Sequence, residues 1–165
     1  MPTSLAVSLR IIAQADLTPS SPLAGAILAK LENATGGRFW TQGTGTGNAS
    51  QCYLADVTMT ASQTVSYNTL AAGALVDTGG ATIDLDELKG MVILCNTGAI
   101  KIDAPATNFI GIFADASDVI KLGAGNCIAF DFGPGGLDVT TNSKWDIVET
   151  ASAAATYSIM FWGAA

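Results

Sequence analysis

The sequence predicts an all-β fold, an antiparallel β-sandwich with jelly-roll-like topology and one short helix near the N-terminus. Short segments in which apolar and polar residues alternate recur at spacings of about 8 to 12 residues, which is typical of sandwiches and barrels. Most of the 18 glycines lie between these segments, where turns are expected. The length of 165 residues fits one domain overall.

The first third of the chain predicts a separate, loop-rich region. Val7, Leu9 and Ile11 alternate with polar residues, which indicates a short strand with one buried face. Pro22 follows two serines that can cap a helix, so residues 22–32 are expected to be helical. The polar, glycine-rich segment 41–50 is interpreted as a loop. We therefore assign residues 1–50 to an N-terminal strand, helix and loop that could serve as an interaction arm.

Residues 51–165 are predicted to form the core of the sandwich. Tight turns are expected at 96–98 and 123–126, because Asn and Gly tolerate positive φ angles, and an irregular loop at 133–136. Between these turns, apolar and polar residues alternate with the period of a strand. The predicted strands are 53–60, 63–70, 81–85, 91–95, 100–103, 109–113, 118–122, 127–132, 145–149 and 157–162.

Charge excludes several classes of partner. The formal net charge is −7 and only 13% of residues are charged. The basic residues are scattered, whereas phosphate binding needs clustered Lys and Arg, so no nucleic acid partner is expected.

No apolar run approaches the roughly 20 residues that span a bilayer, so neither a membrane segment nor a signal peptide is expected. A weakly charged surface rich in Ala, Gly, Ser and Thr favours close contact with other proteins.

The residues give little support for an enzyme. Without histidine the chain has no Ser-His-Asp or Cys-His arrangement, so no catalytic residue, cofactor or metal is expected. Cys95 and Cys127 adjoin apolar residues and are interpreted as small buried hydrophobes in a reducing compartment. The densest acidic group, Asp84, Asp86 and Glu87, could supply the carboxylate pair of a glycosidase. Asp84 and Asp86 are instead expected to face water, while Ile83 and Leu85 point inward.

Two further acidic residues offer oxygen ligands. Asp115 and Asp118 could contribute to a calcium site, although the spaced ligand loop of an EF-hand is absent. Side-chain capping of a turn accounts for the same pair, because Asp carboxylates accept hydrogen bonds from backbone amides nearby. We favour the turn.

Aromatic residues are the candidates for binding. Phe39 and Trp40, beside the glycine-rich segment, and Phe161 and Trp162, in the last strand, are the candidate interface residues. An alternative is a carbohydrate-binding, receptor-binding module, in which Trp40, Trp145 and Trp162 would stack on sugar rings. Trp145 and Trp162 lie in apolar strands, which favours core or subunit contacts.

Three segments resemble small virion proteins of tailed bacteriophages: ATIDLDELKGMVILCNTG (81–98), ASDVIKLGAGNCIAFDF (116–132) and ATYSIMFWG (155–163). The similarity begins at Leu70 and leaves the first 69 residues uncovered. It implies a non-enzymatic β-sandwich component of the virion. We expect a capsid decoration or cement protein on the capsid surface, assembled in the host cytoplasm, which binds the major capsid protein and bridges capsomers. Homo-oligomers are expected, with a trimer preferred to a dimer; a tail or neck protein is the alternative.

Overall fold

The computed structural model describes residues 6–9, 38–42, 45–77 and 80–165; the helix expected at 22–32 lies outside them. Two short strands precede the main body, and a 3-10 turn, η1 (Ala71–Gly73), follows β5. The strands are β1 (Ala6–Leu9), β2 (Arg38–Gln42), β3 (Asn48–Ala49), β4 (Gln51–Met59), β5 (Thr64–Asn68), β6 (Glu87–Thr97), β7 (Ala99–Asp103), β8 (Val119–Gly123), β9 (Cys127–Asp131), β10 (Leu137–Asp138), β11 (Lys144–Glu149) and β12 (Ala155–Ala164).

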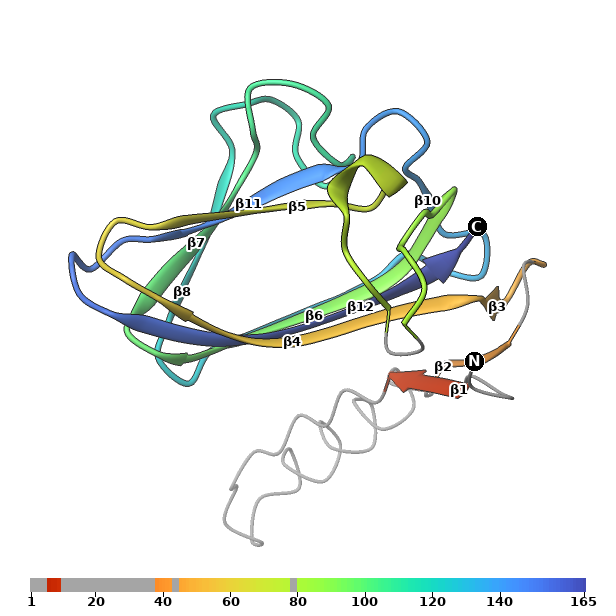
Figure 1. The fold of residues 1–165 in the computed structure, drawn as a ribbon, viewed down its shortest axis with the longest axis horizontal. Coiled ribbons are helices and arrows are strands. Elements are labelled where there is room, and N and C mark those ends of the chain that lie inside the picture. The colour runs from red at the N-terminus through yellow and green to blue at the C-terminus, as the bar shows by residue number, and fades with distance from the viewer. Residues whose placement is uncertain (1–5, 10–37, 43–44, 78–79) are drawn as a thin grey trace, which may run out of the picture.

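Two sheets face each other and form a jelly roll (Figure 1). One sheet, called the β4 sheet, has the order β4-β12-β6, with β9 and β10 both pairing with the far edge of β6. The other, called the β5 sheet, has the order β5-β11-β7-β8. The short connections β4–β5, β6–β7, β8–β9 and β11–β12 each cross from one sheet to the other, so the two strand orders correspond. This is the pattern of a jelly roll, and the predicted fold class is confirmed.

Alternation along the strands builds the core between the sheets. Tyr67 of β5 and Trp145 of β11 stack with ring centroids 5.4 Å apart, and Phe161 of β12 meets Trp145 edge-on at 5.2 Å. Tyr53 of β4 stacks on Phe161 at 4.9 Å. Aromatic side chains from both sheets therefore form the centre of one hydrophobic core.

The turns follow the predicted chemistry. Gly98, with φ of 75°, closes the β6–β7 connection, and Gly125, with φ of 78°, closes the β8–β9 connection. An added Cβ at Gly98 would also lie 2.8 Å from the Ala155 Cβ, so this position requires glycine for space as well as for conformation.

Two predicted strands and one predicted loop are wrong. Segments 81–85 and 109–113 form only isolated bridges, Val76 with Thr82 and Phe109 with Lys144. Their apolar residues are buried because these segments cover one end of the core as loops. The segment 41–50 contains β3, which pairs in parallel with β2. This polar segment can form a strand because the 133–136 loop supplies a hydrogen-bond acceptor to its backbone: the Gly47 N–H donates to Pro134 O at 2.9 Å.

A buried pair of hydroxyls links the two sheets and gives a first prediction. The hydroxyls of Tyr67 and Tyr157 lie 2.7 Å apart in the core, and burial raises the pKa of Tyr157 to about 12. Tyr157→Phe would leave the Tyr67 hydroxyl without its partner, so we expect the free energy of unfolding to fall by about 1 to 3 kcal/mol in urea titrations. The double variant Tyr67→Phe/Tyr157→Phe should recover much of that loss. A double variant less stable than either single variant would contradict this role of the hydroxyl pair.

The close contact between β6 and β12 gives a second prediction. A Cβ on Gly90 would lie 2.3 Å from Cζ2 of the Trp162 ring. Gly90→Ala should therefore destabilise the protein by about 1 to 3 kcal/mol, because the indole must move within a packed layer. Gly135→Ala is the matched control, since nothing lies within 4 Å of its added Cβ. Equal urea midpoints for the two variants would contradict the proposed steric conflict.

Candidate functional site

The outer face of the β4 sheet carries a row of apolar side chains, here called the apolar row. The register places Leu54 of β4 opposite Met160 of β12, Met160 opposite Val92 of β6, and Val92 opposite Ala129 of β9. Leu54 is 61% exposed, and the other three are partly exposed. Residues directly opposite on one face of a sheet lie side by side, so the row is continuous across the sheet.

The next outward positions on one side of the apolar row are Asp56 of β4 and Ser158 of β12, which are polar, and Leu94 of β6, which is apolar and partly exposed. The Asn96 amide donates to the Ser158 hydroxyl at 2.9 Å, and that hydroxyl donates to Asp56 at 2.6 Å. On the other side of the apolar row, Trp162 and Cys52 are buried and pack against Met160 and Val92. The apolar row therefore has a buried apolar support on one side and, over β4 and β12, a hydrogen-bonded polar border on the other.

The structure places the predicted interface residues elsewhere. Phe161 points into the core and has 0% exposure, and Trp162 lies on the outer face of the β4 sheet but also has 0% exposure. Neither side chain offers surface to a partner, because each is covered within the chain. Phe39 and Trp40 belong to β2, opposite Ser8 and Val7 of β1, and their side chains lie outside the described part of the chain.

The sequence contains a signal for Leu54, although Leu54 is not among the predicted interface residues. In β4 the inward positions are odd-numbered and include Tyr53, so Leu54 is an apolar residue on the outward phase, which continues with the polar Asp56 and Thr58. Met160 occupies the same phase in β12, between the inward-facing Ile159 and Phe161. Such residues break the expected alternation and indicate a contact surface.

The outer face of the β5 sheet differs in chemistry. Lys101 and Asp103 of β7 form an ion pair at 2.5 Å, and exposed Lys121 of β8 lies opposite Lys101. Lys144 and Asp146 of β11 also face outward, since Trp145 between them is buried. The two faces of the sandwich are thus distinct, one apolar in part and the other charged and mixed in sign.

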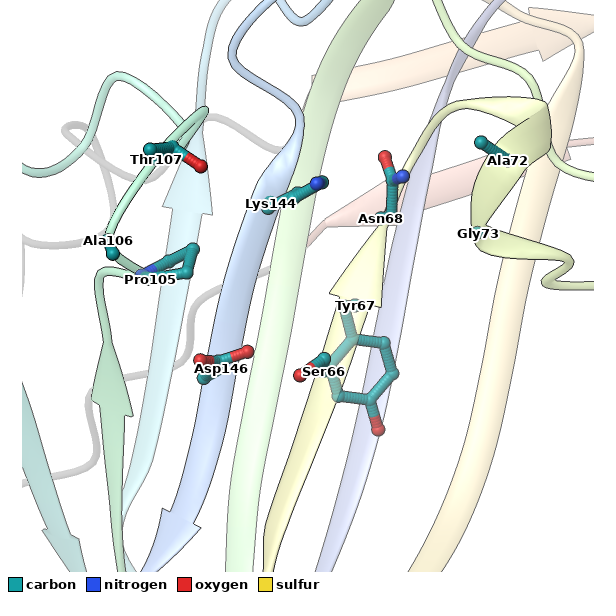
Figure 2. Close-up of a pocket in the computed structure, with 10 residues that line it drawn as sticks. All are labelled: Ser66, Tyr67, Asn68, Ala72, Gly73, Pro105, Ala106, Thr107, Lys144 and Asp146. Atoms are coloured by element: carbon teal, nitrogen blue, oxygen red, sulfur yellow. The ribbon is translucent and has the colours of Figure 1, made fainter.

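A shallow pocket of about 400 Å³ lies on this charged face, between β5, β11 and the segment that follows β7 (Figure 2). We call it the polar pocket. The register sets Lys144 opposite Asn68 and Asp146 opposite Ser66. The polar pocket is lined by Ser66, Tyr67, Asn68, Ala72, Gly73, Pro105, Ala106, Thr107, Lys144 and Asp146.

Hydrogen bonds fix the amide of Asn68 in the polar pocket. Its Oδ1 accepts from the Ser143 hydroxyl at 2.7 Å and from the Leu70 N–H at 3.1 Å. Because both contacts use the oxygen, the Nδ2 group keeps its donors for a ligand. In the described part of the chain, neither Lys144 nor Asp146 forms an ion pair, so both charges also stay available.

The thiols are poor nucleophiles. Burial raises the pKa of Cys52 to about 11, with a smaller contribution from the negative charge of Asp77, and burial also raises the pKa of Cys95 and Cys127. Since the thiolate is the reactive form, each thiol is largely protonated at neutral pH. The expectation that Cys127 is buried is wrong: it lies on the exposed outer phase of β9.

The aspartates considered for catalysis or calcium binding are exposed to solvent or cap turns. Ile83 and Leu85 are buried while Asp84 and Asp86 are exposed, as expected. Asp118 accepts from the Ala114 N–H at 2.7 Å and Asp115 from the Ser117 N–H at 2.7 Å, which confirms their turn-capping role. Over the residues described, no group of three or more Cys, Asp or Glu is placed to hold a metal ion, and no helix is long and apolar enough to cross a membrane.

Comparisons with known proteins show distant similarity of structure. No family model and no curated protein matches the sequence. Solved structures similar to the chain include an HTH_3 family transcriptional regulator from Vibrio cholerae, with 10% identity over 68% of this chain and 43% of that one and a TM-score of 0.40. Another is the Drosophila melanogaster CENP-C cupin domain, with 10% identity over 67% of this chain and 59% of that one and a TM-score of 0.38.

A cupin superfamily protein from Desulfitobacterium hafniense has 8% identity over 96% of this chain and 78% of that one, with a TM-score of 0.38. The chain spans less than two thirds of the length of the first two proteins, 43% and 59%. The jelly-roll topology itself follows from the strand pairing described above.

The accessibility of the thiols gives a third prediction. At pH 8 a maleimide reagent should modify Cys127 in the folded protein, whereas buried Cys52 and Cys95 should react only in denaturant. Mass spectrometry of peptides locates the label. Cys127→Ser should abolish labelling of the native protein, and rapid native labelling of Cys95 would contradict the structure.

Proposed function

We propose that the protein is a non-enzymatic structural component of a tailed-phage virion, a capsid decoration or cement protein that binds the major capsid protein and bridges neighbouring capsomers. The observation that carries this proposal is the exposed apolar row on the outer face of the β4 sheet. The resemblance of segments 81–98, 116–132 and 155–163 to small phage virion proteins supports it.

The apolar row suits repeated, weak attachment. Removing apolar surface from water stabilises a contact by about 25 cal/mol per Å², and a fully covered leucine contributes about 1.5 to 3 kcal/mol. Leu54 is 61% exposed, so covering it gains a large part of that amount. One such contact is small beside the cost of association, but many copies on a closed, symmetric shell add their contributions.

The buried support of the apolar row also favours this role. Met160 and Val92 pack against a buried cluster that includes Trp162, so their side chains lose little conformational freedom when a partner covers them. We propose that copies of the chain associate with one another on the shell, as a trimer in preference to a dimer.

Two of the three tryptophans considered for the carbohydrate-binding alternative are buried. Trp145 and Trp162 each have 0% exposure, so neither ring can stack on a sugar. A tail or neck component differs from a decoration protein in copy number: the decoration protein approaches the major capsid protein in abundance, and a tail component is far scarcer.

Substitution in the apolar row gives a fourth prediction. Leu54→Asp should weaken binding to purified phage heads assembled without the protein by about tenfold or more, because a carboxylate would be desolvated in an apolar contact. Cosedimentation with heads measures the affinity and the number of copies bound. Val119→Asp is the matched control, since Val119 is 40% exposed on the opposite, β5-sheet face.

The outcomes separate the alternatives. Wild-type binding at near-capsid copy number that Leu54→Asp alone weakens supports the proposal. Binding that is restricted to tails, or that both variants lose equally, contradicts it. Light scattering after gel filtration reports the oligomeric state of each variant, and circular dichroism confirms that each is folded.

A further inference from the structure

We propose that the polar pocket binds a neutral carbohydrate. The pocket brings together Lys144 and Asp146 of β11 with Ser66 and Asn68 of β5 on the outer face of the β5 sheet (Figure 2). This site contains none of the tryptophans considered for sugar stacking, and it lies on the sheet opposite the apolar row.

The polar side chains supply both donors and acceptors. Lys144 Nζ and Asn68 Nδ2 donate, the Asp146 carboxylate accepts, and the Ser66 hydroxyl can do either. Register pairing sets these four groups as two neighbouring pairs, Lys144 with Asn68 and Asp146 with Ser66. A sugar hydroxyl both donates and accepts, so adjacent hydroxyls on a ring can accept from the first pair and donate to the second.

The charges of the polar pocket favour a neutral ligand. One lysine and one aspartate line it, so an anion meets the Asp146 carboxylate and a cation meets the Lys144 ammonium. The formal net charge of −7 further disfavours anions. A hydroxyl group can accept a hydrogen bond from the Lys144 ammonium or donate one to the Asp146 carboxylate without either repulsion, and hydrogen bonds to charged groups are stronger than those between neutral groups.

Shape and lining agree with a sugar of small size. The volume of about 400 Å³ is near the lower end of the roughly 300 to 1,000 Å³ that small-molecule sites occupy. Pro105 and Ala106 on one side of the polar pocket and Ala72 on the other supply apolar groups, against which the C–H groups of a sugar ring can pack. Figure 2 shows Pro105 and Thr107 on one side and Asn68 on the other, with Lys144 between them.

The base of the polar pocket is preorganised. The Asn68 amide is held through Oδ1 by two hydrogen bonds, and the ring of Tyr67, which precedes it in β5, is stacked on Trp145 in the core and fixes the strand beneath the pocket. A side chain fixed as Asn68 is loses little conformational freedom on binding, which favours affinity in a shallow site.

The test uses the full chain labelled with ¹⁵N and titrated, in separate experiments, with glucose, galactose, mannose, N-acetylglucosamine and maltose. We expect at least one of these sugars to shift the amide resonances of residues 66–68 and 144–146 selectively. Lys144→Met and Asp146→Asn should each weaken that binding by about tenfold or more, because each removes a charge-assisted hydrogen bond.

Lys121→Met is the matched control for Lys144→Met, since it makes the same change on the same face outside the polar pocket and should leave the sugar affinity unchanged. Unperturbed pocket resonances with every sugar, or equal losses in pocket and control variants, would overturn the proposal. So would tighter binding of glycine, a zwitterion, or of sulfate. Leu54→Asp should retain sugar binding, so failure of head binding and failure of sugar binding are separate results.

Discussion

The aromatic contact between the two sheets determines the rest of the molecule. No strand of one sheet forms a ladder with a strand of the other over the described residues, so side-chain packing must hold them together. Phe161 supplies this contact from the β4 sheet, and Tyr67 and Trp145 supply it from the β5 sheet. Because side chains alternate with a period of two, placing these three inward also decides what faces outward.

The outward sets have different chemistry for that reason. Phe161 inward puts Met160 outward beside Leu54, which creates the apolar row. Trp145 inward puts Lys144 and Asp146 outward, which creates the charged half of the polar pocket. A shift of either strand by one residue would bury outward-facing side chains and expose the aromatic rings, so the core and both surfaces are specified together.

The sequence predicted the architecture well where local patterns decide it. Gly98 and Gly125 indicated turns that need positive φ, and the alternation around Trp145 and Tyr157 indicated strands that the structure contains. The prediction of strands failed where apolar residues are buried in a loop that forms no continuous hydrogen-bonded pairing with a neighbouring strand. Ile83 and Leu85 alternate with exposed aspartates as strand residues do, yet their segment is a loop whose apolar side chains close one end of the core.

The candidate sites were less predictable than the fold, because they depend on which strands become neighbours. Aromatic residues were expected at an interface, but in a core of this size large rings are the side chains that fill the space between sheets. The polar pocket needs β5 beside β11, and its Asn68–Ser143 hydrogen bond joins residues 75 positions apart. The alternation of residues within β5 or within β11 does not indicate that these two strands pair.

A buried lysine holds the 133–136 loop against the β4 sheet, a contact that no sequence periodicity indicates. Lys89 of β6 has no exposed surface, pairs with Glu87 and donates to Pro134 O at 2.8 Å. It therefore holds the 133–136 loop on the β4 sheet, and that loop accepts the Gly47 N–H in turn. A buried ammonium is tolerated only with such partners, so the loop and the lysine depend on each other.

The separation of the two faces has a functional consequence. Packed sheets lie about 10 Å apart, so the apolar row and the polar pocket are divided by the full thickness of the core. Substitutions at that distance without shared partners have nearly additive effects. A copy attached to a surface through the apolar row would therefore present the polar pocket to solvent, and each face could change its binding chemistry while the aromatic contact between the sheets stays the same.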